Sequence, residues 1–569
     1  MTVHPSTREP PDLKTTPFKA HQHQVTEIRL QSTTAYAEPF KDVVLDVAFT
    51  APGGTTVVVP AFWAGEATWC VRYASSETGA HAFRTLCSDE GNPSLHGQVG
   101  EVHIEPYRGD NPLYKHGGIQ VSADRRHFCH ADGTPFFWLG DTWWMGLCGR
   151  LSWPEDFKAL ARNRKETGFN VIQLVAGLYP DMPLFDERGL SSSGFCWEED
   201  LSRINPRFFD EADQRIFHLV EQGLVPCILG AWGYYLPMIG LDNMQRHWRY
   251  LIARWGALPV VWAAAGEQTM PWYLENHAQK AASRIQLASD WSQVMAHMRS
   301  INGFGRLITT HPVTSARDSV TDITLLDFEM QQTGHGSPTP HHALRAWQGW
   351  CAQPAMPVIS AEARYEGLEI GPTVTARNAR EAFWAHALNS GLAGHTYGAN
   401  GIWQVNAVEQ PFGPSPSGSC WGNMPWVQAM HLPGARQMGL AKQFLEALPW
   451  HEVEPQPVQI GRLEGWLQHR PRLRRVVHKL GWLQSRQAPV AMGIAREQSM
   501  AIAYTVSDQS FSIDLAPFKK PVKAIWIDPT NFDEHAVQFE VRGRQMHVQP
   551  DRTNAAGESD WLLLLQPIR

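Results

Sequence analysis

Two glutamates, each at the end of a short apolar run, are the pair of residues in this chain best suited to chemistry. Glu267 closes the run PVVWAAAGE at 259–267, and Glu362 lies in the run PVISAEARYE at 357–366. Two carboxyl groups held in one site can act as general acid and nucleophile in the cleavage of a glycosidic bond. The two runs therefore predict a paired-carboxylate site.

The neighbours of each glutamate indicate how the two roles divide. Apolar surroundings raise the pKa of a carboxyl group, and a raised pKa suits a general acid. The neighbours of Glu267 are mostly apolar: Ala263, Ala264, Ala265, Met270 and Trp272. We therefore predict Glu267 as the acid/base and Glu362 as the nucleophile. Two alternatives stay open: Glu366 could be the nucleophile rather than a substrate ligand, and either glutamate could merely pair with a strand-end arginine such as Arg364.

Polar and aromatic side chains near the ends of the other apolar runs are candidates to bind the substrate. Aromatic walls and amide groups suit a neutral sugar. The candidates are Asp141, Gln173, Trp232, His311, Gln331, Gln332, Tyr365, Glu366, His395, Tyr397 and Trp403. For a lone strand histidine, and for any one of the 24 tryptophans, packing in the core is the competing interpretation.

The elements that must position these side chains alternate between strand and helix. Strand-like runs lie at 136–144, 169–176, 224–232, 259–267, 306–312, 324–331, 357–366 and 391–399. Helical patterns lie between most of them, at 153–167, 206–223, 242–256, 280–302, 340–351 and 374–390. Eight such units predict an α/β fold, the TIM (β/α)8 barrel, whose substrates bind at the carboxyl ends of the strands. A doubly wound sheet would want a glycine-rich loop after the first strand, where this chain has LGDTWW.

Short alternating runs flank the predicted barrel on both sides. They predict an N-terminal tail at 1–23, an immunoglobulin-like β-sandwich at 24–117, the catalytic barrel at 118–453 and a small C-terminal β-sandwich at 454–569. A loop rich in proline, serine and glycine at 408–422 is expected to wall the site.

Composition excludes several classes of function. The net charge of -7 provides no basic surface for nucleic acid, and no window of about 18 apolar residues predicts a membrane span. The eight cysteines form no CxxC pair, which favours a reducing compartment. The start of the chain shows no apolar signal segment, which predicts a cytoplasmic protein, but a chain trimmed of its signal peptide would look the same, so a periplasmic or secreted location stays open. No HExxH motif appears, and we predict no metal and no cofactor.

Six segments together carry a family resemblance over about residues 118–448. They are LGDTWW, GFNVIQLVA, VVWAAAGEQTMPWY, DFEMQQTGHG, PVISAEARYEG and GLAGHTYGANGIWQ, and in this order they resemble the apiosidase-like glycoside hydrolases, domain of unknown function 4038. That family is similar to the clan A retaining barrels. The resemblance implies an acid at the end of strand four and a nucleophilic glutamate at the end of strand seven, which fall on Glu267 and Glu362.

The flanking segments carry resemblances of their own. The stretch YAEPFKDVVLDVAFTAPGGTTVVVPAFWAG resembles the immunoglobulin-like module called domain of unknown function 5060, and WIDP with DWLLLL resembles a collagen-binding-like module. Two positions depart from the barrel family: the clan's asparagine before the strand-four glutamate is Gly266 here, and AGEQ stands where the apiosidase branch commonly has GGDR. Apiose as substrate therefore does not follow.

These observations predict a retaining glycoside hydrolase, exo-acting on a plant or microbial polysaccharide or oligosaccharide. The predicted partner is a carbohydrate substrate; the oligomeric state, the sugar and its anomer are not predicted. The alternative is a catalytically inactive barrel that binds glycans together with its accessory sandwiches. A barrel lyase would want a strand-end lysine, and the strand ends supply none.

Overall fold

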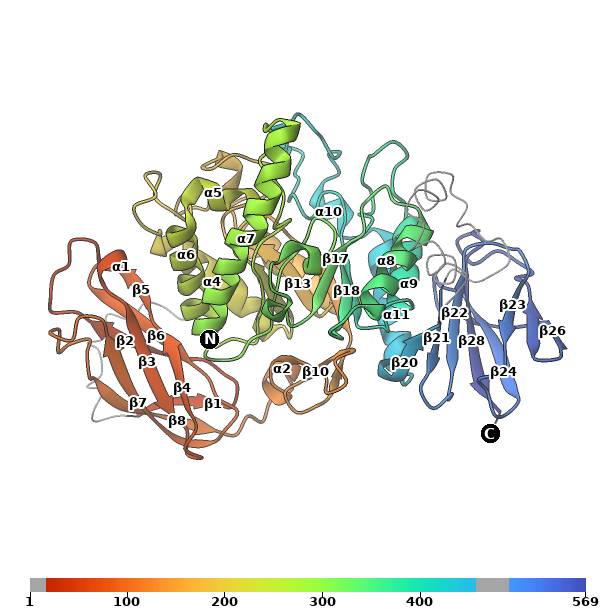
Figure 1. Ribbon diagram of the computed structural model, residues 1–569, viewed down its shortest axis with the longest axis horizontal. Helices are drawn as coiled ribbons and strands as arrows, with labels where there is room; N and C mark the ends of the chain where they lie inside the picture. Colours follow the sequence, from red (N-terminus) through yellow and green to blue (C-terminus); the bar gives the residue numbers. More distant parts are fainter. Residues whose placement is uncertain (1–16, 457–490, 569) are drawn as a thin grey trace.

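A parallel β-barrel occupies the middle of this elongated molecule, with one β-rich region at each end (Figure 1). The computed structural model describes residues 17–456 and 491–568. Most of the predicted N-terminal tail (1–16), and residues 457–490 and 569 of the predicted C-terminal sandwich, lie outside the described residues. The predicted fold class is confirmed.

Eight parallel strands form the barrel, and each is short and buried. They are β12 (Trp138–Thr142), β13 (Val171–Val175), β14 (Val225–Leu229), β15 (Val261–Ala263), β16 (Ile308–Thr309), β17 (Glu329–Gln332), β18 (Val358–Glu362) and β19 (Gly394–Tyr397). They pair in the order β16-β15-β14-β13-β12-β19-β18-β17, so the barrel is nearly closed. Strands buried on both faces favour continuous apolar runs. β14 (VPCIL) and β15 (VWA) show such runs, whereas β17 (EMQQ) and β19 (GHTY) also carry polar side chains.

Helices cover the outside of the barrel between successive strands. They are α3 (Glu155–Thr167), α4 (Pro206–Glu221), α5 (Leu236–Ile239), α6 (Leu241–Trp255), α7 (His277–Ile301), α8 (Thr339–Cys351), α9 (Ala376–Ala387), α10 (Trp426–Ala429) and α11 (Pro433–Glu446). Between β16 and β17 the chain forms only short 3-10 turns at Ala316–Ser319 and Ile323–Leu325, in line with the short link predicted there. A small sheet of β9 (Ile119–Val121), β10 (Phe128–His130) and β11 (Pro135–Phe136), which the sequence analysis did not separate, precedes the barrel.

The N-terminal region is built from two sheets facing one core. One sheet has β1 (Phe18–His21), β8 (Val99–Glu105), β7 (Gly79–Cys87), β3 (Leu45–Thr50) and β4 (Thr56–Pro60); the other has β2 (Thr26–Gln31), β6 (Thr68–Tyr73) and β5 (Phe62–Gly65). Short helices α1 (Pro39–Asp42) and α2 (Pro112–Lys115) lie in the connections. The sheet starts at Phe18, inside the stretch expected to be a tail, because β1 pairs in parallel with β8.

The C-terminal region also has two sheets. The larger contains β20 (Val453–Pro455), β21 (Ala491–Ala495), β22 (Ala501–Thr505), β28 (Trp561–Pro567), β24 (Val522–Ile527) and β25 (Glu534–Ala536). The smaller contains β23 (Phe511–Asp514), β27 (Gln545–Val548) and β26 (Phe539–Arg542). Within the described ranges no helix is long and apolar enough to cross a membrane.

Buried ion clusters join both outer regions to the barrel. On the N-terminal side, Asp213 of α4 accepts hydrogen bonds from Arg72 of β6 (3.0 Å), from Arg254 of α6 (3.0 Å) and from the Trp255 indole (2.7 Å). On the C-terminal side, Arg380 of α9 donates to both oxygens of Asp560, each at 2.8 Å. Burial raises the pKa of Asp213, but the two arginines outweigh burial and hold it well below the usual range.

Replacing Asp213 with asparagine should destabilise the protein strongly. The substitution removes the buried charge that Arg72 and Arg254 share and leaves them only their contacts with Glu27 and Asp210. Breaking a buried ion pair in this way costs about 3–5 kcal/mol. The first transition in a calorimetric melt should therefore shift to lower temperature. Asp551→Asn, which breaks an exposed pair with Arg552, is the control and should leave the melt unchanged; equal melting of both variants would contradict this account.

Candidate active site

A cavity of about 280 Å³ opens at the carboxyl ends of the barrel strands. Its walls come from the segments that end or follow β12, β13, β14, β15, β17, β18 and β19. The lining residues are Trp144, Pro180, Asp181, Trp232, Glu267, Met270, Tyr273, Gln332, His335, Glu362, Tyr365, Leu368, Trp403, Ser419 and Trp421. Ser419 and Trp421 belong to the loop expected to wall the site.

The amide of Gln332 joins the two glutamates at the centre of this cavity. Its Nε2 donates to Glu267 Oε1 at 3.0 Å and to Glu362 Oε1 at 3.1 Å. Because both oxygens contact one nitrogen, they lie at most about 6 Å apart. This limit is below the roughly 6.5–9.5 Å of inverting glycosidases and compatible with the separation of about 5–5.5 Å in retaining ones. Glu362 is the last residue of β18, and Gln332 is the last residue of β17.

Two neighbouring glutamines of β17 face opposite sides, as successive residues of a strand do. The pairing of β17 with β18 shifts register between Gln331 and Gln332. Gln332 faces the glutamates. Gln331 is turned outward, where it contacts His386 at 3.2 Å and donates to Glu329 at 3.0 Å.

Glu267 sits in a strained turn four residues beyond β15. Its φ of 41° is unusual for a residue other than glycine, and such backbone strain occurs often at functional sites. Burial raises the pKa of Glu267 to about 7, and the negative charge of Glu362 adds to the increase, against the opposing hydrogen bond from Gln332. The carboxyl group can therefore hold a proton near neutral pH.

Glu362 is held in the opposite, ionised state by two histidines. His335 Nε2 lies 3.0 Å from Glu362 Oε1, while His335 Nδ1 lies 2.7 Å from the carbonyl oxygen of Ala363, so both ring nitrogens face acceptors. His311 Nε2 lies 3.4 Å from Glu362 Oε2, without the alignment of a hydrogen bond. Burial raises the pKa of Glu362, but the histidines outweigh burial and bring it well below its usual range. Burial lowers the pKa of His335, and the bond with Glu362 more than reverses this, for a net increase.

Unpaired donors line the walls around the two carboxylates. The indole nitrogens of Trp232, Trp403 and Trp421 and the hydroxyl of Tyr365 are buried and have no hydrogen-bond partner in the described chain. A buried polar group without a partner costs about 1–3 kcal/mol, and native proteins keep few of them. These groups are therefore suited to a ligand rich in oxygen acceptors.

Several other candidates lie outside the cavity. Asp141 is fully buried and pairs with Arg164 of α3 at 2.6 Å, and the Tyr397 hydroxyl donates to Glu366 Oε2 at 2.6 Å. The same oxygen of Glu366 also accepts the Gly434 amide at 2.9 Å, which directs this carboxyl group away from Glu362.

The two remaining strand candidates are buried in the barrel itself. Gln173 donates to the carbonyl oxygen of Ala361 at 2.9 Å and is fully buried. His395 packs on Phe383 of α9, with ring centres 5.1 Å apart, and burial lowers its pKa well below the usual range. Neither residue lines the cavity.

Among the lining residues that sequence reasoning did not single out, five carry aromatic, imidazole or carboxyl side chains: Trp144, Asp181, Tyr273, His335 and Trp421. All five lie in loops, where neither a period of two nor one of 3.6 fixes the direction of a side chain. The segment TGHG around His335 belongs to one of the six segments that carry the family resemblance. Its residue types alone, a histidine between two glycines, do not indicate that His335 lines a site.

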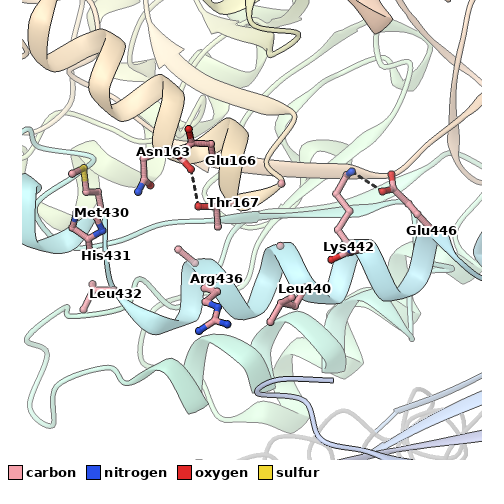
Figure 2. Close-up of a pocket in the computed structure, with 14 residues that line it drawn as sticks. Asn163, Glu166, Thr167, Met430, His431, Leu432, Arg436, Leu440, Lys442 and Glu446 are labelled. Atoms are coloured by element: carbon pink, nitrogen blue, oxygen red, sulfur yellow. Dashed lines mark hydrogen bonds and ion pairs between the residues drawn. The ribbon is translucent and has the colours of Figure 1, made fainter. Parts of the chain in front are cut away.

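A larger hollow of about 670 Å³ lies elsewhere, between α3 and α11 on the outside of the barrel (Figure 2). The two helices meet closely there, since a side chain on Gly439 would overlap the carbonyl oxygen of Thr167. Among the described residues this hollow has no pair of carboxyl groups held together as Glu267 and Glu362 are. Its Glu446 forms an ion pair with Lys442 at 2.8 Å instead. In the described ranges no cluster of histidine, cysteine, aspartate or glutamate has the arrangement of a metal site. The strand-end cavity is therefore the candidate active site.

Comparison with known families identifies two regions of the chain. Residues 122–452 match the family described as "Apiosidase-like, catalytic domain", and residues 19–88 match "Domain of unknown function (DUF5060)". The search of curated proteins gave no match.

Solved structures share the fold over most of the chain. A Bacteroides vulgatus protein provisionally named a glycoside hydrolase aligns with a TM-score of 0.65 at 17% identity, covering 97% of this chain and 100% of that one. A glycoside hydrolase family 5 protein from the same species aligns with a TM-score of 0.60 at 21% identity, covering 82% and 96%. The chain therefore has a glycoside hydrolase-like fold.

Replacing Glu267 with glutamine should stabilise the protein at and above neutral pH. The folded state keeps the Glu267 proton up to about pH 7, while the unfolded chain releases it near pH 4.3. The free energy of unfolding of the wild type therefore falls as pH rises from about 4.3 to 7, whereas that of the amide variant does not. The difference in free energy of unfolding between variant and wild type should grow over that pH range to the order of 1–3 kcal/mol and then level off.

Denaturant melts at several pH values test this expectation. Glu497→Gln, at an exposed position, is the control and should show no such window. A stability difference between Glu267→Gln and wild type that does not change with pH would contradict the assigned protonation.

Proposed function

We propose that this chain, which belongs to the apiosidase-like family of catalytic domains, cleaves glycosidic bonds with retention of configuration, using Glu362 as nucleophile and Glu267 as acid/base. The observation that carries the proposal is the shared contact of both carboxylates with Gln332. It brings the two groups to a separation suited to double displacement and leaves no wide gap for an attacking water between them.

The opposite protonation of the two glutamates supports the division of roles. A nucleophile must be ionised, and the pKa of Glu362 lies well below its usual range. A general acid works best with a pKa near the working pH, and the pKa of Glu267 is about 7.

The first step forms a covalent intermediate. A Glu362 oxygen attacks the anomeric carbon, the bond from this carbon to the leaving oxygen breaks, and the proton of Glu267 passes to that oxygen. The product of the step is a glycosyl ester on Glu362, which no longer carries a charge. Since the charge of Glu362 helps to raise the pKa of Glu267, that pKa falls once the ester forms. The loss of this charge adapts Glu267 to its next role.

In the second step Glu267 acts as a base. It takes a proton from a water molecule that attacks the anomeric carbon, the ester bond breaks, and Glu362 recovers its negative charge. The two displacements together restore the original anomeric configuration. Each group ends in its starting state.

The shape and lining of the cavity support an exo-acting enzyme for a neutral sugar. Its volume of about 280 Å³ lies just below the roughly 300–1,000 Å³ of typical ligand sites. The space suits one terminal sugar better than a long chain segment. The ring faces of Trp144, Trp232 and Trp403 offer apolar surface, and the unpaired indole nitrogens offer donors to sugar oxygens. We infer that the substrate is the end of a plant or microbial oligosaccharide or polysaccharide.

Glu362→Gln should lower turnover by several orders of magnitude without unfolding the protein, because the amide has nearly the same shape but cannot form the glycosyl ester. A panel of aryl glycosides, first screened with wild type, provides the assay. Glu366→Gln is the matched control four residues along the chain; it should keep most of its turnover, because that carboxyl group faces Tyr397 and Gly434. Near wild-type turnover of Glu362→Gln would exclude Glu362 as nucleophile, and wild-type inactivity on every glycoside would favour a glycan-binding barrel.

Glu267→Ala should lose about 10²- to 10⁴-fold on substrates with poor leaving groups, the usual contribution of general acid catalysis. An activated aryl leaving group needs little protonation, so the glycosyl-enzyme should accumulate, and added azide should restore turnover. The expected product is a glycosyl azide with the configuration of the substrate, identified by NMR.

The azide products of the two variants also test the direction of the assignment. An inverted azide from Glu362→Ala, with none from Glu267→Ala, would exchange the two roles. Failure of azide with both variants would contradict the pair and make Glu366 the next residue to test.

A further inference from the structure

A third carboxylate, Asp181, lies in the wall of the catalytic cavity. It follows β13 and is only 7% exposed. Its Oδ1 accepts a hydrogen bond of 2.6 Å from the Tyr273 hydroxyl. No hydrogen bond from the described chain reaches its Oδ2, although the indole of Trp421 lies close to the carboxylate. A buried carboxylate with one oxygen unused has capacity to accept hydrogen bonds from a ligand.

The loop around Asp181 is fixed by the residues that follow β14. The Tyr234 hydroxyl contacts the carbonyl oxygens of Tyr179 and Met182 at 3.1 and 3.0 Å, and the Tyr235 hydroxyl donates to the same Met182 oxygen at 3.0 Å. Asp181 itself adopts a left-handed backbone conformation with a φ of 60°. These bonds hold the carboxylate in place before any ligand arrives, as a selective binding group requires.

Carboxyl groups outnumber groups that can carry a positive charge around the cavity. Asp181, Glu267 and Glu362 contribute carboxyl groups, while His335 is the cavity-lining group that can carry a positive charge. No lysine or arginine belongs to the lining within the described ranges. His335 is already engaged by Glu362 at 3.0 Å. A carboxylate on a ligand would thus meet like charges and find no free cation to pair with.

We propose that Asp181 determines specificity: its free oxygen accepts hydroxyl groups of an uncharged sugar, and its charge excludes sugars that carry a carboxylate. This inference rests on the proposed function, because it takes the cavity to hold a sugar ring. The unpaired indole N–H groups of Trp232 and Trp403 complement Asp181, since they donate while it accepts. A sugar hydroxyl can both donate and accept, whereas a carboxylate can only accept.

The test is a binding measurement that does not depend on hydrolysis. The full chain is titrated with matched pairs of monosaccharides, glucose with glucuronate and galactose with galacturonate, and tryptophan fluorescence reports binding because several tryptophans line the cavity. Wild type should bind the neutral member of at least one pair more than tenfold tighter than the uronate. A hydrogen bond to a charged group accounts for about 10- to 100-fold in affinity. Asp181→Asn should therefore bind the neutral sugar more weakly, and the ratio between its affinities for the neutral sugar and the uronate should shrink by about that factor.

Two further variants guard against a merely structural effect. Asp200→Asn makes the same charge change in the same β13–α4 connection, at an exposed position, and should keep the wild-type preference. Tyr273→Phe removes the partner of Oδ1 but keeps the charge, and should still reject uronates. Circular dichroism and melting temperature establish that each variant is folded.

The outcomes separate this inference from the proposed catalysis. Equal binding of neutral sugar and uronate by wild type, an unchanged preference in Asp181→Asn, or no binding of any sugar would overturn the inference. Selective binding that depends on Asp181, in a protein that hydrolyses no aryl glycoside, would support the inference and overturn the catalysis. Hydrolysis of aryl glycosides, together with a binding preference that Asp181→Asn does not change, would support the catalysis and overturn the inference.

Discussion

The central constraint in this structure is that two carboxyl groups share one amide in a buried cavity. Two negative charges at that distance cannot both be stable out of water, so one group must hold a proton or receive strong compensation. The two carboxyl groups receive different compensation from their neighbours. Glu362 has His335 at 3.0 Å and His311 at 3.4 Å, whereas the hydrogen bond that Glu267 accepts within the described chain comes from the neutral amide of Gln332. This difference favours the proton on Glu267. The same arrangement supports the proposed division of roles, in which Glu362 attacks and Glu267 protonates.

The barrel makes this asymmetry possible because each partner comes from a different strand end. β15, β17 and β18 supply Glu267, Gln332 and Glu362, and their parallel direction brings all three to one face. This part could be predicted from the sequence, because a short apolar run followed by a lone carboxylate is a local signal and parallel strands end on the same side. The pairing by Gln332 was harder to predict, because Gln331 and Gln332 point to opposite faces of β17 and the sequence does not show which of them faces the cavity.

The candidates that fall outside the cavity show where strand-end reasoning stops. Successive side chains on a strand point to opposite faces. In β19, His395 and Tyr397 share the face turned toward the helices, where His395 meets Phe383 of α9 and Tyr397 lies near Arg164 of α3. Asp141 of β12 faces the same layer and also pairs with Arg164. Proximity to a strand end therefore does not decide whether a side chain lines the cavity. For these three residues the deciding factor is whether their position along the strand directs the side chain into the barrel or toward the helices. For His335 and Asp181 no such rule exists, because turns and tyrosine hydroxyl contacts place them.

The glycine that departs from the clan pattern has a physical reason within this cavity. A side chain at Gly266 would place its Cβ 2.1 Å from the Trp232 ring, so the indole occupies the space that an asparagine would need. Trp232 in turn lines the cavity and carries one of the unpaired N–H groups. The absence of a side chain before Glu267 thus leaves room for an aromatic wall and an indole donor that follow the neighbouring strand β14. Polar contacts to the ligand must then come from elsewhere in the cavity, and Asp181 is the buried acceptor that the loop after β13 supplies.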